Sequence, residues 1–319
     1  MPQQKSYMQG WIPARFIQTY QDLLCKWIYA GDTPFTDPFF DETLAKCMSH
    51  PFNSKPHACV SRIDELSAMA DTIDPVEPSA IIFHVSRCGS TLLSQMLSQL
   101  PETISLAEVP FFDDILRSEI LNTAEKDKVL KAAVRLYGQR RMGAEKQLFI
   151  KLDSWHVFYY EVFRRLYPHV PFVFLYRDPY DVLQSHRKHR GMQAVPGVIQ
   201  SAVFGLSQAE IHGLSLDEYT ARILEQYFSA YLHIAQKDKH VCWINYKQGA
   251  SHMIRQIASM AGQSWTGQDL QLMEERSQYH SKHPSQAFHE TLEQDVRPAY
   301  LHAATSLYTT LDTQTSIKL

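Results

Sequence analysis

The stretch SAIIFHVSRCGSTLLSQMLSQL (residues 79–100) decides the fold. It begins with an apolar run from Ile81 to Val85, which is typical of a strand buried on both faces. A short turn of small and polar residues follows, and an amphipathic segment begins at Leu92. A strand that runs through such a turn into a helix directs several backbone N–H groups and the positive end of the helix dipole at one point. We therefore expect this turn to bind an anion.

The side chains of the turn also suit an anion. Gly89 allows a ligand to approach the backbone closely, and Ser90 and Thr91 offer hydroxyl donors. Arg87 carries a planar, permanent charge that matches phosphate or sulfate oxygens. The ordinary alternative is a βα turn with a capping hydroxyl and a surface arginine. The turn lacks the second glycine and the lysine of a G-x-x-x-x-G-K-[ST] loop, which disfavours an ATP or GTP site of that type.

From Ala80 onward, short apolar runs alternate with longer amphipathic segments. The expected strands are Ala80–Val85, Gln147–Leu152, Phe172–Tyr176 and Val241–Tyr246. The expected helices are Leu92–Leu100, Asp127–Met142, Trp155–Leu166, Pro179–Lys188 and Asp217–Gln236. This alternation predicts a three-layer α/β fold in which helices flank a central parallel sheet, with a ligand crevice at the carboxyl ends of the strands.

The N-terminal part of the chain has a different pattern. We expect residues 1–78 to form a mostly helical extension with loops, packed on the core, and a helix to cover Phe16–Tyr29. The proline-punctuated stretch 71–79 marks the boundary. Residues 79–319 then form the α/β domain, which ends in helices.

Composition limits the partners and the location. The 319 residues include 31 Lys and Arg against 34 Asp and Glu, a net charge of −3 that argues against a nucleic-acid partner. Neither a signal peptide nor an apolar run of membrane-spanning length is present, so we expect a cytoplasmic protein without a membrane partner. The five cysteines lack C-x-x-C spacing, and the H-x-x-H pairs at 186–189 and 280–283 lack further ligands. We therefore predict no metal site.

A second stretch supplies another phosphate motif. In FVFLYRDPYDVLQSHRKH (residues 172–189), Arg177 ends a predicted strand and Asp178-Pro179 opens a helix. Ser185 lies eight residues after Arg177, about two turns into that helix, so both side chains can face one crevice. A helix cap or a surface ion pair is the ordinary alternative for each.

Together, the two stretches resemble the phosphate motifs of sulfotransferases that use 3′-phosphoadenosine 5′-phosphosulfate (PAPS), over about residues 80–285. The resemblance implies a P-loop-like fold. It also implies a sulfotransferase of the bacterial type that acts on small molecules. It assigns the 5′-phosphosulfate to a loop formed by Arg87, Cys88, Gly89, Ser90 and Thr91. It assigns the 3′-phosphate to Arg177 and Ser185.

Two further stretches resemble the family less closely. VCWINYKQ (residues 241–248) is similar to a later strand whose tyrosine packs near adenine, here Tyr246, although Asn245 and Lys247 depart from the pattern. YHSKHPSQAF (residues 279–288) resembles a segment that closes over the 3′-phosphate, which nominates Ser281 and Lys282. A buried strand tyrosine and a solvated loop lysine are the ordinary alternatives.

Three residues compete for the role of general base, and we rank Glu108 first. A glutamate at this place serves as the base in branches that resemble tyrosylprotein sulfotransferases. Asp153 and His156 follow about equally, and Asp153 is also placed to cap the next helix. Lys151 matches the family lysine that assists the leaving group, and Asp153 stands where cytosolic branches have a histidine.

The resemblance implies in-line transfer of a sulfuryl group from PAPS to a hydroxyl or amino group of a small metabolite, without a metal and with 3′-phosphoadenosine 5′-phosphate (PAP) as product. Arg87 would neutralise charge on the leaving group. One alternative is a small-molecule kinase on the same fold, which should need Mg²⁺ and a loop lysine. The other is a catalytically silent nucleotide-binding protein, which should have lost the acidic and basic groups. A homodimer is left open.

The acceptor pocket should be shaped by residues outside the phosphate motifs. FTDPFF (35–40), EVPFFDDIL (108–116) and GMQAVPGVIQSAVFG (191–205) contain the aromatic, acidic and Gly/Pro residues of a pocket wall or lid. Plain core and loop is the ordinary alternative. Asp113 and Asp114 are candidates to bind a cationic acceptor. Their position at the exposed start of a helix, where acidic residues are favoured, explains them equally well.

Overall fold

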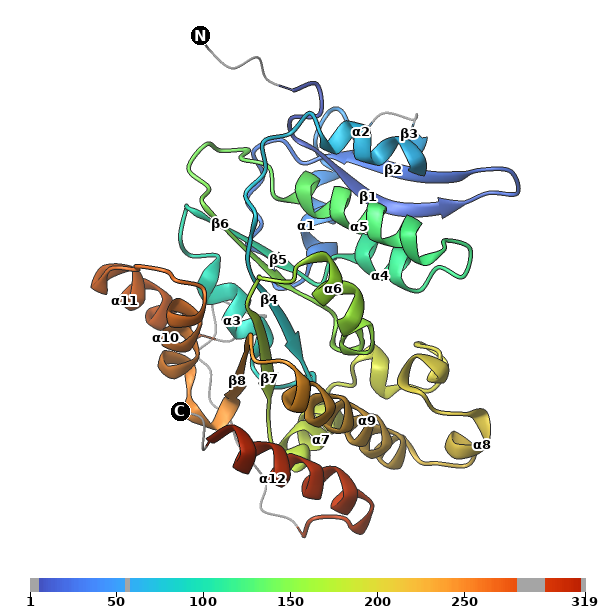
Figure 1. Ribbon diagram of the computed structural model, residues 1–319, viewed down its shortest axis with the longest axis vertical. Coiled ribbons are helices and arrows are strands. Elements are labelled where there is room, and N and C mark those ends of the chain that lie inside the picture. The colour runs from blue at the N-terminus through green and yellow to red at the C-terminus, as the bar shows by residue number, and fades with distance from the viewer. Residues whose placement is uncertain (1–5, 55–57, 280–295, 317–319) are drawn as a thin grey trace. The chain divides into compact units, whose positions relative to one another are not determined.

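The computed structural model describes residues 6–54, 58–279 and 296–316 (Figure 1). Two compact units make up the chain. The first contains Met1–Ile81, Ser94–Leu152 and Val162–Pro168, and the second contains Ile82–Leu93, Asp153–Glu161 and His169–Leu319.

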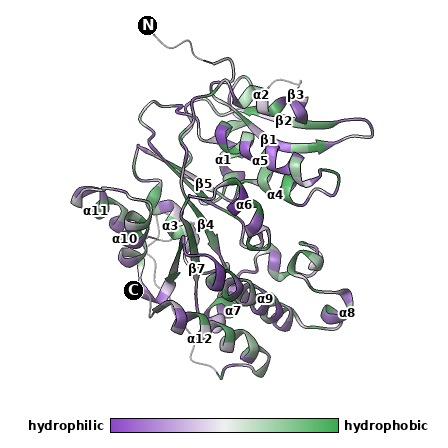
Figure 2. Ribbon diagram, viewed as in Figure 1, coloured by the Kyte–Doolittle hydropathy of each residue, from purple (hydrophilic) through white to green (hydrophobic). Residues whose placement is uncertain are grey.

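A five-stranded parallel sheet with the strand order β5-β6-β4-β7-β8 forms the framework. Its strands are β4 (Pro78–His84), β5 (Thr103–Ala107), β6 (Gln147–Lys151), β7 (Phe172–Tyr176) and β8 (Val241–Asn245). All residues of β5 and β7 are buried, and Figure 2 shows β4 and β7 mainly as hydrophobic. The predicted α/β fold with a parallel sheet and flanking helices is confirmed.

The first unit also holds a three-stranded antiparallel sheet, β1 (Trp11–Gln18), β2 (Leu23–Tyr29) and β3 (Cys59–Arg62). Two helices, α4 and α5, pack against β1, and α2 packs against α5. The helices of this unit are α1 (Phe40–Cys47), α2 (Leu66–Ala70), α4 (Pro110–Leu116) and α5 (Thr123–Tyr137), with a short 3₁₀ turn at Ile63–Glu65.

The antiparallel sheet corrects the predicted helix at Phe16–Tyr29. The apolar residues of this segment also satisfy helical spacing, which misled the prediction. A polar turn interrupts the segment, and in it the backbone N–H of Thr19 donates to the carbonyl of Asp22 at 2.9 Å. On β2, the buried Cys25 and Trp27 alternate with the half-buried Lys26, which is the period of a strand.

The second unit is helical around β7 and β8. Its long helix α9 (Leu216–Lys237) packs against α7 and the C-terminal α12, and Figure 2 shows both hydrophobic and hydrophilic colours along α9. The other helices here are α7 (Pro179–Lys188), α8 (Gln208–Ile211), α10 (Ala250–Met260), α11 (Gly267–Arg276) and α12 (His302–Ser316). Short 3₁₀ turns lie at Ser154–Tyr159, Met192–Ala194, Ser201–Phe204, Tyr246–Gln248 and Ala299–Leu301. Two helices include residues of both units, α3 (Ser90–Leu97) and α6 (Tyr160–Leu166).

The sequence predicted four of the five parallel strands to within two residues. It missed β5 because Thr103 and Ser105 interrupt the apolar run. Both side chains are nevertheless buried and hydrogen-bonded: the Ser105 hydroxyl donates to the carbonyl of Ser94 at 3.1 Å, and that of Thr103 to Gln147 Oε1 at 3.2 Å. A satisfied hydroxyl can be buried at little cost, so polarity alone did not exclude a strand.

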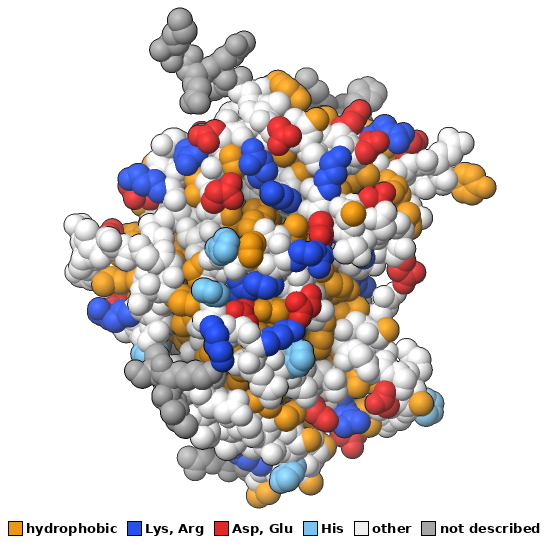
Figure 3. All heavy atoms as spheres, viewed as in Figure 1, with side chains coloured by type: hydrophobic (Ala, Val, Ile, Leu, Met, Phe, Trp, Pro, Cys, Tyr) orange, Lys and Arg blue, Asp and Glu red, His pale blue; other side chains and the backbone are white. Residues whose placement is uncertain are grey.

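The distribution of charge on the surface agrees with the modest net charge. Acidic and basic side chains are interspersed over the face shown in Figure 3. Within the described ranges, no helix has both the length and the apolar character needed to cross a membrane.

Candidate active site

The turn between β4 and α3 has an unusual backbone conformation. Among the described non-glycine residues, three have positive φ: Ser86 (67°), Arg87 (49°) and Glu108 (59°). This conformation is costly for residues with a Cβ and tends to persist at functional sites. The backbone N–H of Ser86 donates to His84 Nδ1 at 3.1 Å, which helps to hold the turn. Two of the three strained residues therefore lie in the predicted anion-binding turn.

Gly89 and Tyr246 are in close contact. Gly89 has φ +82°, and a Cβ built on it would lie 2.5 Å from Cδ2 of Tyr246. No side chain can occupy that space while the tyrosine ring stays in place. Glycine is thus required here by both the backbone and the neighbouring ring.

The same tyrosine ring faces Arg177, the residue that follows β7. The guanidinium carbon of Arg177 lies 4.7 Å from the centroid of the Tyr246 ring. Arg177 is 6% exposed, and its Nε lies 3.4 Å from Oδ2 of Asp181, one turn along α7. The structure thus brings together Gly89, Arg177 and Tyr246, which follow three different strands.

The other residues of the turn point in different directions. The guanidinium of Arg87 donates to the carbonyl of His189, just beyond the end of α7. The Cys88 side chain is fully buried and its thiol donates to the carbonyl of Leu175 at 3.5 Å, so only its backbone can reach a ligand. Ser90 is buried at the first turn of α3, and Thr91 beside it is half-buried.

A pocket of about 530 Å³ lies at the ends of β7 and β8 in the second unit. Three basic residues and two acidic residues line it, so its charge is positive on balance. The lining residues are Leu92, Arg177, Asp178, Asp181, Asn245, Tyr246, Lys247, Gly249, Ala250, Ser277, Arg297 and Tyr308. This volume lies in the range of small-molecule and cofactor sites.

Arg297 contributes a second guanidinium to this pocket. Its Nη2 lies 2.9 Å from Oδ2 of Asp178, the residue that caps α7, and its guanidinium carbon lies 5.6 Å from the centroid of the Tyr180 ring. Ser185 does not line the pocket. It lies half-buried on α7, one turn beyond Asp181, and therefore on the same helix face.

The C-terminal helix α12 fixes the ends of β7 and β8 through Asp312. This carboxylate accepts hydrogen bonds from Nδ2 of Asn245 at 2.8 Å and from Oη of Tyr176 at 3.0 Å, and it pairs with Lys247. Burial alone would raise the pKa of Asp312, but these hydrogen bonds hold it below its usual value. The same ion pair raises the pKa of Lys247.

In the first unit, Glu108 and Lys151 form an ion pair. Ala107 at the end of β5 is in register with Lys151 at the end of β6, so Glu108 follows directly beside it. Oε1 of Glu108 lies 2.9 Å from Nζ of Lys151, and the backbone N–H of Glu108 donates to the carbonyl of Lys151 at 2.8 Å. The lysine side chain is 1% exposed and the glutamate side chain 19%, so the carboxylate is the more accessible partner.

The loop before α1 lies close to this pair. The centroid of the half-buried Phe39 ring lies 5.2 Å from Nζ of Lys151. The carbonyl of Thr36 in the same loop accepts a hydrogen bond from Nε2 of Gln95 at 2.7 Å. Asp113 and Asp114 instead make structural contacts: Asp113 pairs with Arg117 at 3.0 Å, and Asp114 pairs with Arg15 at 3.2 Å.

Asp153 and His156 form a buried pair in the second unit. Oδ2 of Asp153 lies 3.7 Å from Nε2 of His156, and the histidine is 0% exposed. Asp153 occupies the N-cap position of the following 3₁₀ turn without a capping hydrogen bond from its side chain. The neighbouring Ser154 hydroxyl lies 3.0 Å from the hydroxyl of Tyr227.

Comparison with known proteins identifies the family. The sequence matches the model described as the sulfotransferase family over residues 78–267, which is more than half of the chain. The chain belongs to this family. Membership supports a sulfotransferase activity and thus a transferase enzyme.

Several solved structures that are similar to this sulfotransferase are described as sulfotransferases. The sulfotransferase domain of the Synechococcus PCC 7002 olefin synthase is 17% identical, with 75% of this chain and 96% of that chain covered and a TM-score of 0.47. The Alicyclobacillus acidocaldarius sulfotransferase is 17% identical, with 76% and 95% covered and a TM-score of 0.44. Sulfotransferase STF9 from Mycobacterium avium is 14% identical, with 80% and 78% covered and a TM-score of 0.46. A search of curated proteins found no match. The family assignment rests on the family model.

Sequence reasoning missed several residues that line or support the pocket at the ends of β7 and β8. Arg297 and Asp312 lie 119 and 67 positions along the chain from their partners Asp178 and Asn245, and no local motif marks them. Lys247 was noted only as a departure from the family pattern. Of the nominated residues, Ser281 and Lys282 lie outside the described residues.

Proposed function

We propose that this sulfotransferase moves a sulfuryl group from PAPS to a hydroxyl or amino group of a small metabolite and releases PAP. One observation carries the proposal: the positive pocket at the ends of β7 and β8, where Arg177 faces Tyr246 and Tyr246 contacts Gly89. Two separate phosphate-binding elements suit a nucleotide that carries phosphate at both its 3′ and 5′ positions. The proposal includes a cytoplasmic location and a small acceptor rather than a nucleic acid or a membrane.

Binding of the nucleotide is assigned to residues of the second unit. Arg177 and Arg297 would hold the 3′-phosphate through charge-assisted hydrogen bonds, and Tyr246 would pack beside the adenine. The backbone of residues 87–91 and the hydroxyls of Ser90 and Thr91 would hold the 5′-phosphosulfate. Asp178 and Asp181 now pair with the two arginines, so a phosphate would take over guanidinium contacts that carboxylates make.

The chemical step needs a base for the acceptor proton and positive charge beside the departing phosphate. In an in-line transfer, the acceptor oxygen or nitrogen forms a bond to sulfur while the bond from sulfur to the phosphate oxygen breaks. We assign the acceptor proton to Glu108, and charge stabilisation on the departing phosphate to Arg87 and Lys151. The accessible carboxylate of Glu108, its positive φ and its ion pair with Lys151 support this choice. Asp153 and His156 are more deeply buried and are ranked behind it.

Turnover without metal is the direct test. The protein is incubated with PAPS and a panel of hydroxylated and amino metabolites in the presence of EDTA, and PAP and the sulfated products are followed by mass spectrometry. We expect PAP to form only with an accepted metabolite. A parallel reaction with ATP and Mg²⁺ tests the kinase alternative. The proposal fails if calorimetry detects binding of neither PAPS nor PAP at micromolar concentrations, or if turnover requires Mg²⁺.

A further inference from the structure

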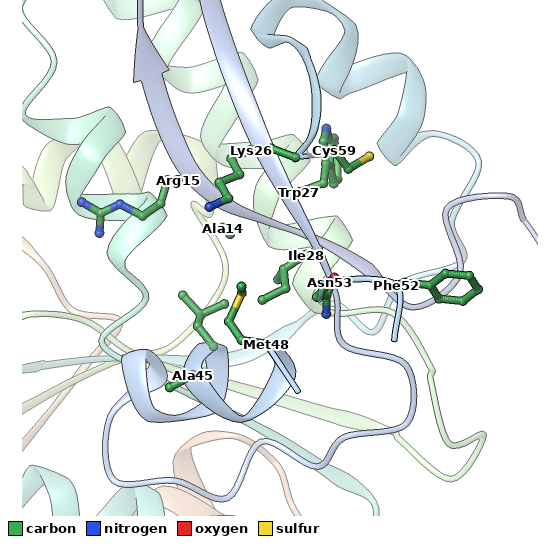
Figure 4. Close-up of a pocket in the computed structure, with 12 residues that line it drawn as sticks. Ala14, Arg15, Lys26, Trp27, Ile28, Ala45, Met48, Phe52, Asn53 and Cys59 are labelled. Atoms are coloured by element: carbon green, nitrogen blue, oxygen red, sulfur yellow. The ribbon is translucent and has the colours of Figure 1, made fainter. Parts of the chain in front are cut away.

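A second pocket, with a volume of about 340 Å³, lies in the first unit between strands β1 and β2 and helix α1 (Figure 4). Its walls are mainly apolar and come from β2, α1 and the loop after α1: Ile28, Leu44, Met48 and Phe52. Met48 and Phe52 are 47% and 54% exposed, so part of the apolar wall is open to solvent. None of its lining residues lines the pocket at the ends of β7 and β8.

Two cations occupy directly paired positions on the strands that line this pocket. Arg15 of β1 and Lys26 of β2 are direct cross-strand partners, and both line the pocket. Like charges at such positions destabilise a sheet, because the two side chains share one face a few ångströms apart. Arg15 is partly balanced by Asp114 at 3.2 Å. Lys26, which is half-buried, has no ion-pair partner in the part of the chain that the structure describes.

The pocket walls are held in place without a ligand. The side-chain amide of Asn53 donates to the carbonyls of Tyr29 and Cys47, each at 2.7 Å. Its Oδ1 accepts a hydrogen bond from the backbone N–H of Tyr29 at 2.8 Å. These three bonds tie the end of α1 and the following loop to β2. The pocket is therefore preformed, which reduces the entropy lost on binding.

We propose that this pocket binds a small anionic amphiphile, of which an arylsulfonate or aryl sulfate is the simplest kind. The anionic group would lie by Arg15 and Lys26, and the apolar body would pack on Ile28, Leu44 and Met48. Charge complementarity selects an anion, because two adjacent cations have only one described carboxylate between them. The apolar walls select an apolar body, and the volume of about 340 Å³, near the lower end of the range for small-molecule sites, limits the ligand to a small one. This site is independent of the proposed transfer reaction.

Calorimetry with naphthalene-1-sulfonate tests the site, and uncharged naphthalene-1-sulfonamide is the matched probe of the same size. Titrations are done with and without PAP. A probe that binds in the nucleotide pocket would be displaced by PAP, whereas a probe in the second pocket would not. We expect the sulfonate to bind equally well in both conditions and about tenfold more tightly than the sulfonamide. Equal affinity for the two probes, or complete displacement by PAP, would overturn the proposal.

Variants then locate the bound probe. Lys26→Gln should lower the affinity for the sulfonate about fivefold. Lys26→Arg should retain the affinity of the wild type because it keeps the charge. Ala45→Trp fills the pocket from an exposed position of α1 and should abolish binding without unfolding the protein, which circular dichroism checks. Lys131→Gln, which removes an exposed lysine of α5, is the control and should change nothing. Unchanged binding to Ala45→Trp contradicts the assignment.

Discussion

The guanidinium of Arg177 lies over the ring of Tyr246, with its central carbon 4.7 Å from the ring centroid. This contact joins the residue after β7 to the residue after β8. The arginine is almost fully buried and pairs with Asp181, so its orientation is fixed from two sides. A fixed, desolvated guanidinium recognises phosphate geometry better than a mobile lysine would.

Arg177→Ala should distinguish recognition of the 3′-phosphate from recognition of the rest of the nucleotide. If Arg177 holds the 3′-phosphate, the variant should lose about 30-fold in affinity for PAP, the value of a charge-assisted hydrogen-bond pair. Its affinity for AMP, which has no 3′-phosphate, should change by less than about threefold. Calorimetry with both nucleotides measures the difference. Arg255→Ala, which removes an exposed arginine of α10, is the control; an equal loss for AMP and PAP would refute the 3′-phosphate role.

Gly89→Ala should destabilise the protein more than an ordinary glycine substitution. The new Cβ would lie 2.5 Å from Tyr246, in addition to the strain of φ +82°. We expect a loss of about 3 kcal/mol in the free energy of unfolding, measured by urea denaturation. Gly205→Ala is the matched control, because Gly205 has φ +71° with no atom within 4 Å of its built Cβ, and it should cost about 1 kcal/mol.

The double variant Gly89→Ala/Tyr246→Ala isolates the clash. Removing the ring should restore the part of the stability that the contact costs, so the two substitutions should couple rather than add. Strict additivity would mean that the backbone strain alone explains the effect.

Asp312 should contribute to stability in a pH-dependent way. Asp312→Ala leaves Lys247, Asn245 and Tyr176 without their shared acceptor, so we expect a loss of about 2 kcal/mol at neutral pH. Because the folded pKa of Asp312 lies below the usual value, its contribution is present above the unfolded pKa of about 3.9 and is lost as pH falls through the folded pKa. The difference from the wild type should therefore shrink below about pH 4. Thermal denaturation from pH 3 to 8 tests this, with exposed Asp71→Ala as control.

The sequence predicted the parts of the molecule that local patterns encode. A strand, a short turn and a helix follow one another without interruption around Arg87 and again around Arg177, so both loops could be placed. Arg297 reaches Asp178 from a position 119 residues away, and no periodicity reports such a contact. The pairing of Glu108 with Lys151 depends on β5 lying next to β6, and β5 itself was hidden by its two hydroxyl residues.

The antiparallel sheet was missed for a related reason. Apolar residues between Phe16 and Trp27 fit both a helix face and two short strands, and only the turn at Thr19–Asp22 distinguishes the two. Cross-strand partners such as Arg15 and Lys26 become neighbours through tertiary structure, so the cation pair could not be read from spacing.

Glu108→Gln should lower kcat at least about 100-fold while the affinity for PAP stays unchanged, because the amide keeps the shape but cannot take a proton. Asp153→Asn and His156→Ala are compared with it at the same saturating concentration of PAPS and should lose less activity. Since Lys151 is buried, its loss of a carboxylate partner also lowers stability, so folding of each variant is checked by its melting temperature. Near-normal turnover in Glu108→Gln with a large loss in His156→Ala would assign the role of general base to the Asp153–His156 pair instead.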